Sequence, residues 1–282
     1  MSKERKIINQ RIEINNDITI SDLVTAIPAG FSGPIFINGD LIILEEDVLN
    51  FGYSDMWLFN EVHIIGNLIE LIDEKNMDLS KLKQINLTVQ GNFYCEKSVS
   101  MKYLSLEVKG DMKTYSNINA RNLKIAGDLA CLEASTEYDL IVRGNLTSEY
   151  KVSATYIDVR GDLICENIFA KNVNVLGDLS FDNTNASFLG VNVENDIYVR
   201  GSIYCSKIVA SKIIAGNNCT SDTSIETSAI QVGGNLDAYN IEAHDSITVN
   251  GKILAPHNWL IDLTTEILIK SFSVVFIFNI FI

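Results

Sequence analysis

The chain has 282 residues, of which 47% are apolar and 21% are charged, with only 3 prolines. This composition is sufficient for a sizeable core, and it excludes both wholesale disorder and a collagen-like or linker-rich chain. The formal net charge of −14 argues against a broad phosphate-binding surface, so nucleic acid is a poor candidate partner.

Residues 1–60 lack a clean repeat and predict an N-terminal capping region. Ser21 and Asp22 indicate the start of a short helix that runs to about Ile27, before Pro28. A strand-like alternation precedes this helix at Ile12, Ile14, Ile18 and Ile20. An aromatic cluster follows it at Tyr53, Trp57, Leu58 and Phe59, which we interpret as part of the cap, with a ligand platform as the alternative.

The charged first residues are not followed by the apolar stretch of an ordinary secretory signal. The five cysteines form neither a C-x-x-C pair nor a dense framework. We therefore expect a cytoplasmic protein.

A glycine-centred phrase, apolar-x-apolar-x-Gly-Asp/Asn-apolar, recurs along most of the chain. Its clearest copies centre on Gly110, Gly127, Gly144, Gly161 and Gly177, with less regular copies at Gly39, Gly66, Gly91, Gly201, Gly216, Gly234 and Gly251. The nine steps from Gly91 to Gly251 cover 160 residues, a mean of about 18. This period is too short for helical repeats, and the leucine-rich-repeat phrase is absent. Residues 61–256 therefore predict a parallel β-helix.

The apolar positions within one unit indicate three short strands per coil of about 17 residues. Each strand contributes two inward side chains at a spacing of two, and successive pairs lie about five residues apart. The predicted inward residues of two units are Leu163, Cys165, Ile168, Ala170, Val173 and Val175, then Leu236, Ala238, Ile241, Ala243, Ile247 and Val249. The predicted fold is an all-β, single-stranded parallel β-helix with an N-terminal cap, and we choose the right-handed form.

The glycine and the acidic residue after it predict a tight corner. The glycine either takes a positive φ or lets two segments approach closely, and the Asp or Asn side chain bonds backbone N–H groups locally. These acidic or amide residues form a column of Asp111, Asp128, Asn145, Asp162 and Asp178. The position before glycine holds Lys109, Arg143, Arg160 and Arg200, which would offset repulsion in the column. A calcium site is the alternative, but the G-G-x-G-x-D phrase of calcium-binding repeats is absent.

Four cysteines, Cys95, Cys131, Cys165 and Cys205, each lie four residues after a glycine, on the predicted inward side. Thr114, Ser148, Phe181 and Ala238 occupy the same column in other coils. Because a non-cysteine coil separates the first three, their sulfur atoms are too far apart for a disulfide or a shared zinc, and we interpret them as core residues. Only Cys205 and Cys219 fall on adjacent coils.

The sequence supplies no recognisable catalytic, cofactor or metal site. His63 is predicted to face outward, His244 to lie at a corner and His257 to belong to the C-terminal region. The 24-residue step from Gly177 to Gly201 contains an excursion around 181–188, which is a candidate binding surface. Phosphate-binding loops, G-x-S-x-G and H-E-x-x-H are absent, and the outward residues Asp158, Arg160 and Asp162 only imitate a pectin-lyase-type cluster.

Residues 257–282 form an apolar C-terminal segment. Residues 271–282 are almost wholly apolar, rich in β-branched and aromatic residues, and too short to cross a membrane as a helix. We expect a terminal cap or edge strand, with a self-association or partner contact as the second interpretation and a membrane contact or a cloning artefact as the third.

The stacked I-x-V-x-Gly-Asp-Leu coils of residues 61–256 resemble the bacterial polymer-forming bactofilin-like β-helices. The resemblance implies a right-handed, cytoplasmic β-helix that assembles end to end as a scaffold. This chain is longer than the usual bactofilin core, and a cap at its N-terminus would block end-to-end growth.

The sequence therefore predicts a non-catalytic scaffold or interaction protein that self-associates through its ends or its C-terminal segment. The alternative is a carbohydrate-active or transferase β-helix enzyme with a site on the lateral surface near residues 178–200.

Overall fold

The computed structural model describes residues 5–8, 11–58, 61–73, 75, 77–82, 84–181, 190–254, 258–261 and 266–269. About 60% of the chain is strand, wound as a parallel β-solenoid of about nine turns at a spacing of about 17 residues. The predicted parallel β-helix is thereby confirmed, while its handedness stays a prediction. The chain divides into two compact units, Met1–Gly144 and Asn145–Ile282, which are described in turn.

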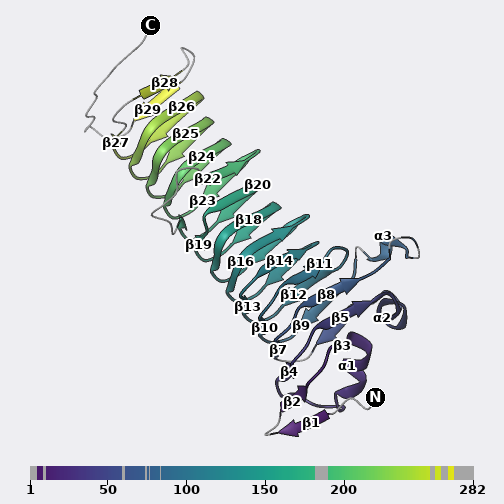
Figure 1. Ribbon diagram of the computed structural model, residues 1–282. Coiled ribbons are helices and arrows are strands. Elements are labelled where there is room, and N and C mark those ends of the chain that lie inside the picture. Colours follow the sequence, from purple (N-terminus) through teal and green to yellow (C-terminus); the bar gives the residue numbers. More distant parts are fainter. Residues whose placement is uncertain are drawn as a thin grey trace. The chain divides into compact units, whose positions relative to one another are not determined.

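The coils of unit 1 contribute to three sheets, here called the first, second and third sheet in chain order, and the described strands of the first coil lie in the first and second (Figure 1). The first sheet contains β2 (Arg11–Ile14), β4 (Ile35–Ile37), β7 (Val62–Ile64), β10 (Phe93–Cys95), β13 (Met112–Thr114) and the start of β16 (Leu129–Thr136). The second contains β3 (Ile18–Thr19), β5 (Leu41–Leu44), β8 (Leu68–Leu71), β11 (Val99–Met101), β14 (Asn117–Ala120) and the end of β16. The third contains β6 (Met56–Leu58), β9 (Asn86–Val89), β12 (Ser105–Val108), β15 (Leu123–Ile125) and β17 (Asp139–Val142).

The coils of unit 2 follow the same order, and several of their strands run through two or three sheets. The continuous strands are β18 (Leu146–Val159), β20 (Asn167–Val175), β24 (Ile203–Ala215), β25 (Cys219–Val232) and β26 (Leu236–Val249). The shorter strands are β19 (Leu163–Ile164), β21 (Leu179–Ser180) and β27 (Ile253–Leu254) in the first sheet, β22 (Gly190–Val193) and β28 (Asn258–Ile261) in the second, and β23 (Asp196–Val199) and β29 (Glu266–Ile269) in the third.

Equivalent apolar residues stack on one another and form the core. In the pairing of β25 with β26, Ile225 lies opposite Ile241 and Ile230 opposite Ile247. All twelve residues predicted to point inward, six from Leu163 to Val175 and six from Leu236 to Val249, are buried. The spacing of two within each strand and of about five between strands therefore identified the interior correctly, because inward residues of consecutive coils stay opposite one another within each of the three sheets.

The corner between the third and first sheets is built on the Gly-Asp/Asn pair. Asp111 Oδ1 accepts a hydrogen bond from the backbone N–H of Asp128, the equivalent residue one coil later, at 2.9 Å. Asp162 Oδ1 accepts in the same way from Asp178 N–H at 2.8 Å, and Asn235 Oδ1 from Lys252 N–H at 2.8 Å. The predicted local bond is thus wrong in detail, because the acceptor reaches the following coil rather than its own corner. We call this arrangement the Asx ladder.

The glycine is required by close approach and not by a positive φ. Among the described glycines, only Gly30 and Gly52 have a positive φ, of 78° and 65°. A Cβ added to Gly127 would overlap Asp111 Oδ1 and would lie 2.9 Å from the carbonyl carbon of Gly110. The Asx ladder therefore runs where only a glycine leaves room for it.

The early copies of the glycine phrase lie at a different corner. Gly39 and Gly66 join the first sheet to the second. The Asx residues that follow them make the same kind of bond at this corner, because Asp40 Oδ1 accepts from Asn67 N–H at 2.7 Å. From Gly91 onward the phrase joins the third sheet to the first. The glycine phrase therefore marks one corner in the first coils and a different corner from Gly91 onward.

The N-terminal region belongs to the solenoid and also carries a cap. Strand β1 (Arg5–Ile8) pairs antiparallel with β2, while β2 and β4 already pair in parallel, so the coils begin before the predicted boundary at residues 60 and 61. Helix α1 (Ile20–Ala26) confirms the predicted helix. Its N-cap is Thr19, whose side chain accepts from the N–H of Asp22 at 3.2 Å, and not Ser21 or Asp22.

Two further helices, α2 (Glu45–Asn50) and α3 (Leu79–Leu82), follow β5 and β8. Of the predicted aromatic cluster, Leu58 is buried and Trp57 is 45% exposed, and no ring contact joins the described members Tyr53 and Trp57. Phe59, His257 and residues 271–282 lie outside the described residues.

Candidate functional site

A stacked ring ladder lies on the outer face of the first sheet in unit 1. Phe36, His63 and Tyr94 occupy the central positions of β4, β7 and β10, and the backbone register places them directly opposite one another. The imidazole lies 4.4 Å from the Phe36 ring centroid and 4.5 Å from that of Tyr94, with interplanar angles of 9° and 18°. Its Nε2 lies 2.6 Å from Glu61 Oε1.

This ladder confirms that His63 faces outward and explains what the imidazole does. Both of its faces are covered by rings, and one ring nitrogen is engaged by a carboxylate. The sequence did not reveal the ladder because the glycine phrase follows the first-sheet strand at Gly39 and Gly66 but precedes it at Gly91, so the glycines do not mark the register of these strands. A signal for the ladder was present in the sequence, because a ring-bearing residue stands at the centre of each of three short strands, Ile35–Ile37, Val62–Ile64 and Phe93–Cys95.

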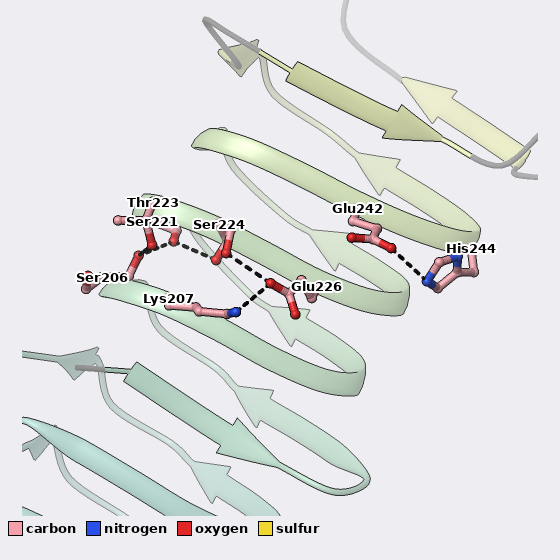
Figure 2. A network of polar contacts seen from close by, with 8 residues as sticks. All are labelled: Ser206, Lys207, Ser221, Thr223, Ser224, Glu226, Glu242 and His244. Carbon is pink, nitrogen blue, oxygen red and sulfur yellow. Dashed lines mark hydrogen bonds and ion pairs between the residues drawn. The ribbon is translucent and has the colours of Figure 1, made fainter. Parts of the chain in front are cut away.

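A polar network follows the outer face of the second sheet in unit 2 (Figure 2). Lys207 Nζ lies 2.6 Å from Glu226 Oε1, and the Ser224 hydroxyl donates to the same oxygen at 3.3 Å. One coil further, His244 Nε2 lies 3.5 Å from Glu242 Oε1. Glu226 and Glu242 are direct neighbours in the register of β25 and β26. The side chains in these two ion pairs are 39–53% exposed.

Hydroxyl groups extend the network around the corner between the first and second sheets (Figure 2). The Ser221 hydroxyl lies 2.7 Å from the carbonyl oxygen of Ser206 and 3.0 Å from that of Ser224. Thr223 Oγ1 donates to the Ser206 carbonyl at 2.8 Å. These bonds connect β24 to β25, so the hydroxyl groups serve the packing of consecutive coils.

The network does not assemble a nucleophile with its base. The Lys207 ammonium and the Glu226 carboxylate neutralise each other, and Ser224 contacts a carboxylate rather than a histidine. His244 lies at a corner, as predicted, and its Nε2 faces the Glu242 carboxylate of the same strand. Nucleophilic catalysis needs a hydroxyl or thiol that is hydrogen-bonded to a base, and a third group that orients the base. The hydrogen bonds around Ser224 do not form such a chain.

Two carboxylates of unit 1 are held inside the structure by backbone donors. Asp47 is 2% exposed and accepts from Leu44 N–H at 2.7 Å and Ser21 N–H at 3.0 Å. Glu70 accepts from Tyr103 N–H at 3.0 Å. Burial raises the pKa of Glu70 from about 4.5 to about 7, against the opposing effects of the Leu104 N–H and the charge of Lys102.

The residues that imitate a lyase-type cluster belong to separate contacts. Asp158 Oδ1 accepts from Asn174 Nδ2 at 2.5 Å on the third sheet, and Asp162 belongs to the Asx ladder. Arg160 is exposed. Lys109 Nζ lies 2.5 Å from Glu107 Oε1, so this cation is directed along its own strand rather than at the acidic column. Within the described ranges, no three His, Cys, Asp or Glu side chains gather as a metal site.

The cysteines are core residues, as predicted. All five are buried free thiols. Cys205 lies opposite Ser221, whereas Cys219 lies opposite Ile203, so the two cysteines occupy different columns of adjacent coils. Burial raises the pKa of Cys95 to about 11 and that of Cys219 to about 12, which leaves these thiols protonated and unreactive at neutral pH.

The predicted lateral site near residues 178–200 is only partly within the described residues. Strands β21, β22 and β23 continue the three sheets, and Asp178 Oδ1 accepts from Ser202 N–H at 2.7 Å as part of the Asx ladder. Residues 182–189 of the excursion lie outside the described ranges.

Comparison with family models, curated proteins and solved structures finds no match for this chain. Among the helices that the structure describes, none has the length and apolar character needed to cross a membrane.

Proposed function

We propose that the protein is a non-catalytic scaffold or interaction protein that self-associates through the C-terminal end of its solenoid and acts in the cytoplasm. The observation that supports this proposal most is the use of polar side chains between coils. The Asp111 bond of the Asx ladder, the Phe36–His63 stack and the Lys207–Glu226 ion pair each join one coil to the next. Side chains that are bonded to the neighbouring coil stabilise a surface on which another protein can bind, and they are not arranged as a nucleophile with its base.

The two ends of the solenoid differ in a way that favours association at the C-terminal end. At the N-terminal end, β1 pairs antiparallel with β2 and thereby covers the edge of the first sheet. At the other end, β27, β28 and β29 each pair with β26. In the pairing registers of the described residues, β26 is the partner of each of these three strands. Unpaired strand edges are templates for further strands, and the apolar residues 271–282 follow directly in the sequence.

Sedimentation velocity over a concentration series tests this proposal. The full chain is expected to form larger species as concentration rises, and a chain that ends at Lys270 is expected to remain smaller with an unchanged circular dichroism spectrum. A full chain that sediments as a monomer at every concentration would overturn the self-association part of the proposal.

A further inference from the structure

Three consecutive coils of unit 1 carry a helical insertion at the same place. Helices α1, α2 and α3 each follow a strand of the second sheet, namely β3, β5 and β8, and lie on one side of the strands (Figure 1). In the next coil, only residues 102–104 connect β11 to β12. In solenoids, insertions that recur on one face often form the binding surface.

The inserted segments contact one another and so form one surface, which we call the helical corner (residues 20–34, 45–55, 71–73, 75 and 77–82). Ser21 N–H donates to Asp47 Oδ1 at 3.0 Å, which joins α1 to α2. Tyr53 Oη lies 3.8 Å from Met77 Sδ, and Lys81 Nζ lies 5.3 Å from the centre of the Tyr53 ring. These contacts join the segment of α2 to that of α3.

Each inserted segment presents an exposed apolar side chain beside an exposed acidic one. On α1 these are Val24 (36% exposed) and Asp22, and on α2 they are Leu49 (52%) and Glu46. At the end of β8 they are Leu71 (55%) and Asp73. Exposed apolar groups repeated on adjoining segments are typical of a contact surface rather than of isolated solvent-facing residues.

The described residues of the helical corner carry seven Asp or Glu residues against two lysines, Lys75 and Lys81, so the charge of this surface is predominantly acidic. From residue 12 to residue 74 the chain has 12 Asp or Glu residues and no Lys or Arg, whereas the rest of the chain has 22 Lys or Arg against 24 Asp or Glu. This stretch thus holds nearly all of the net charge of −14. A second copy of the chain would carry the same acidic stretch and would be repelled, so the complementary occupant is cationic.

We infer that the helical corner docks a cationic amphipathic helix of a partner protein. Apolar residues on one face of that helix cover Val24, Leu49 and Leu71, and lysine or arginine residues beside them pair with Glu46 and Asp73. Helices that dock in this way use apolar anchors at helical spacing, and the surrounding charges provide selectivity and fast association. This inference rests on the proposed function as an interaction protein and names the chemistry of its partner.

Fluorescence anisotropy with a labelled 14-residue peptide of leucine and lysine, with the leucines at helical spacing, tests the inference. The full chain is expected to bind this peptide and not a peptide in which glutamate replaces every lysine. The double variant Glu46→Gln with Leu49→Ser is expected to weaken binding about tenfold. The matched control Glu149→Gln with Tyr150→Ser removes the same charge and an exposed apolar group in unit 2, and it is expected to change binding less than about twofold.

Equal weakening by both double variants would show that the peptide responds only to net charge and would overturn the inference. Binding of the glutamate peptide would overturn it as well. Circular dichroism of each variant confirms that its fold is retained. Sedimentation of the full chain without peptide reports on self-association separately, so failure of the docking inference and failure of the proposed self-association are distinguishable.

Discussion

At the residue scale, the Gly-Asp/Asn pair combines two requirements in neighbouring positions. The Asx side chain of one coil occupies the space beside the glycine of the next coil, and its Oδ1 accepts the N–H of the residue after that glycine. The ladder tolerates both aspartate and asparagine, as at Asp162 and Asn235, because both provide the same acceptor atom. The pair therefore recurs for a geometric reason and not as a binding motif.

Gly127→Ala is expected to destabilise the protein by about 2 kcal/mol or more, because the new methyl group must displace the Asp111 carboxylate or the backbone of Gly110. Chemical denaturation measures the change. Asp111→Asn is the control, and it is expected to change stability by less than about 0.5 kcal/mol because Oδ1 is retained. An unaltered denaturation midpoint for Gly127→Ala would contradict the close-approach explanation.

Glu70 is expected to make stability depend on pH. Since its pKa is raised from about 4.5 to about 7, the folded protein holds this proton in a range where the unfolded chain has lost it. The free energy of unfolding therefore falls as the pH rises from about 4.5 to about 7, and it is independent of this group at higher pH. Urea denaturation at pH 5 and pH 7.5 should show a smaller difference for Glu70→Gln than for the unaltered chain. The same difference in both proteins would refute this role.

At the element scale, the ring ladder joins three strands of the first sheet through their outward side chains. His63→Ala is expected to destabilise the protein by about 1 kcal/mol, because it removes both ring contacts and the Glu61 contact. His63→Phe keeps a flat ring between Phe36 and Tyr94 and is expected to recover more than half of that loss. Thermal unfolding of both variants measures this, and equal loss in the two would mean that stacking contributes nothing.

The sequence predicted the interior far better than the surface. Inward residues such as Ile241 and Val249 follow a period that any coil must repeat, so the pattern identifies them without knowledge of the register. The surface network depends on which coil positions lie opposite each other. The pairing of β25 with β26 shifts register between Ser221 and Ser224 and again between Thr227 and Ala229, and no local pattern indicates such shifts.

The helical corner could not be predicted for a related reason. The sequence indicated α1, because Pro28 and polar residues mark its ends, but α2 and α3 are only 6 and 4 residues long. Helices this short are not stable alone and form because Val48 and Leu82 are buried against the coils. Because the glycine phrase lies at a different corner in the first coils, the sequence around these insertions shows no clean repeat and predicts a capping region.

At the scale of the whole molecule, each coil contacts only its neighbouring coils. The edges of the terminal coils therefore determine whether the protein stays monomeric or self-associates. The N-terminal end is covered by the antiparallel strand β1, and the strands of the last coil have a described partner on one side. This difference in edge pairing is the physical argument on which we propose association at the C-terminal end.

Hydrogen–deuterium exchange of the full chain at low and at high concentration tests the central claim most directly, since it reports which backbone amides a contact protects. The account predicts slower exchange at high concentration in residues 253–269, which contain β27, β28 and β29, with unchanged exchange in the lateral strands β20 and β22. Exchange in residues 253–269 that does not depend on concentration would contradict the account, as would protection confined to β20 and β22.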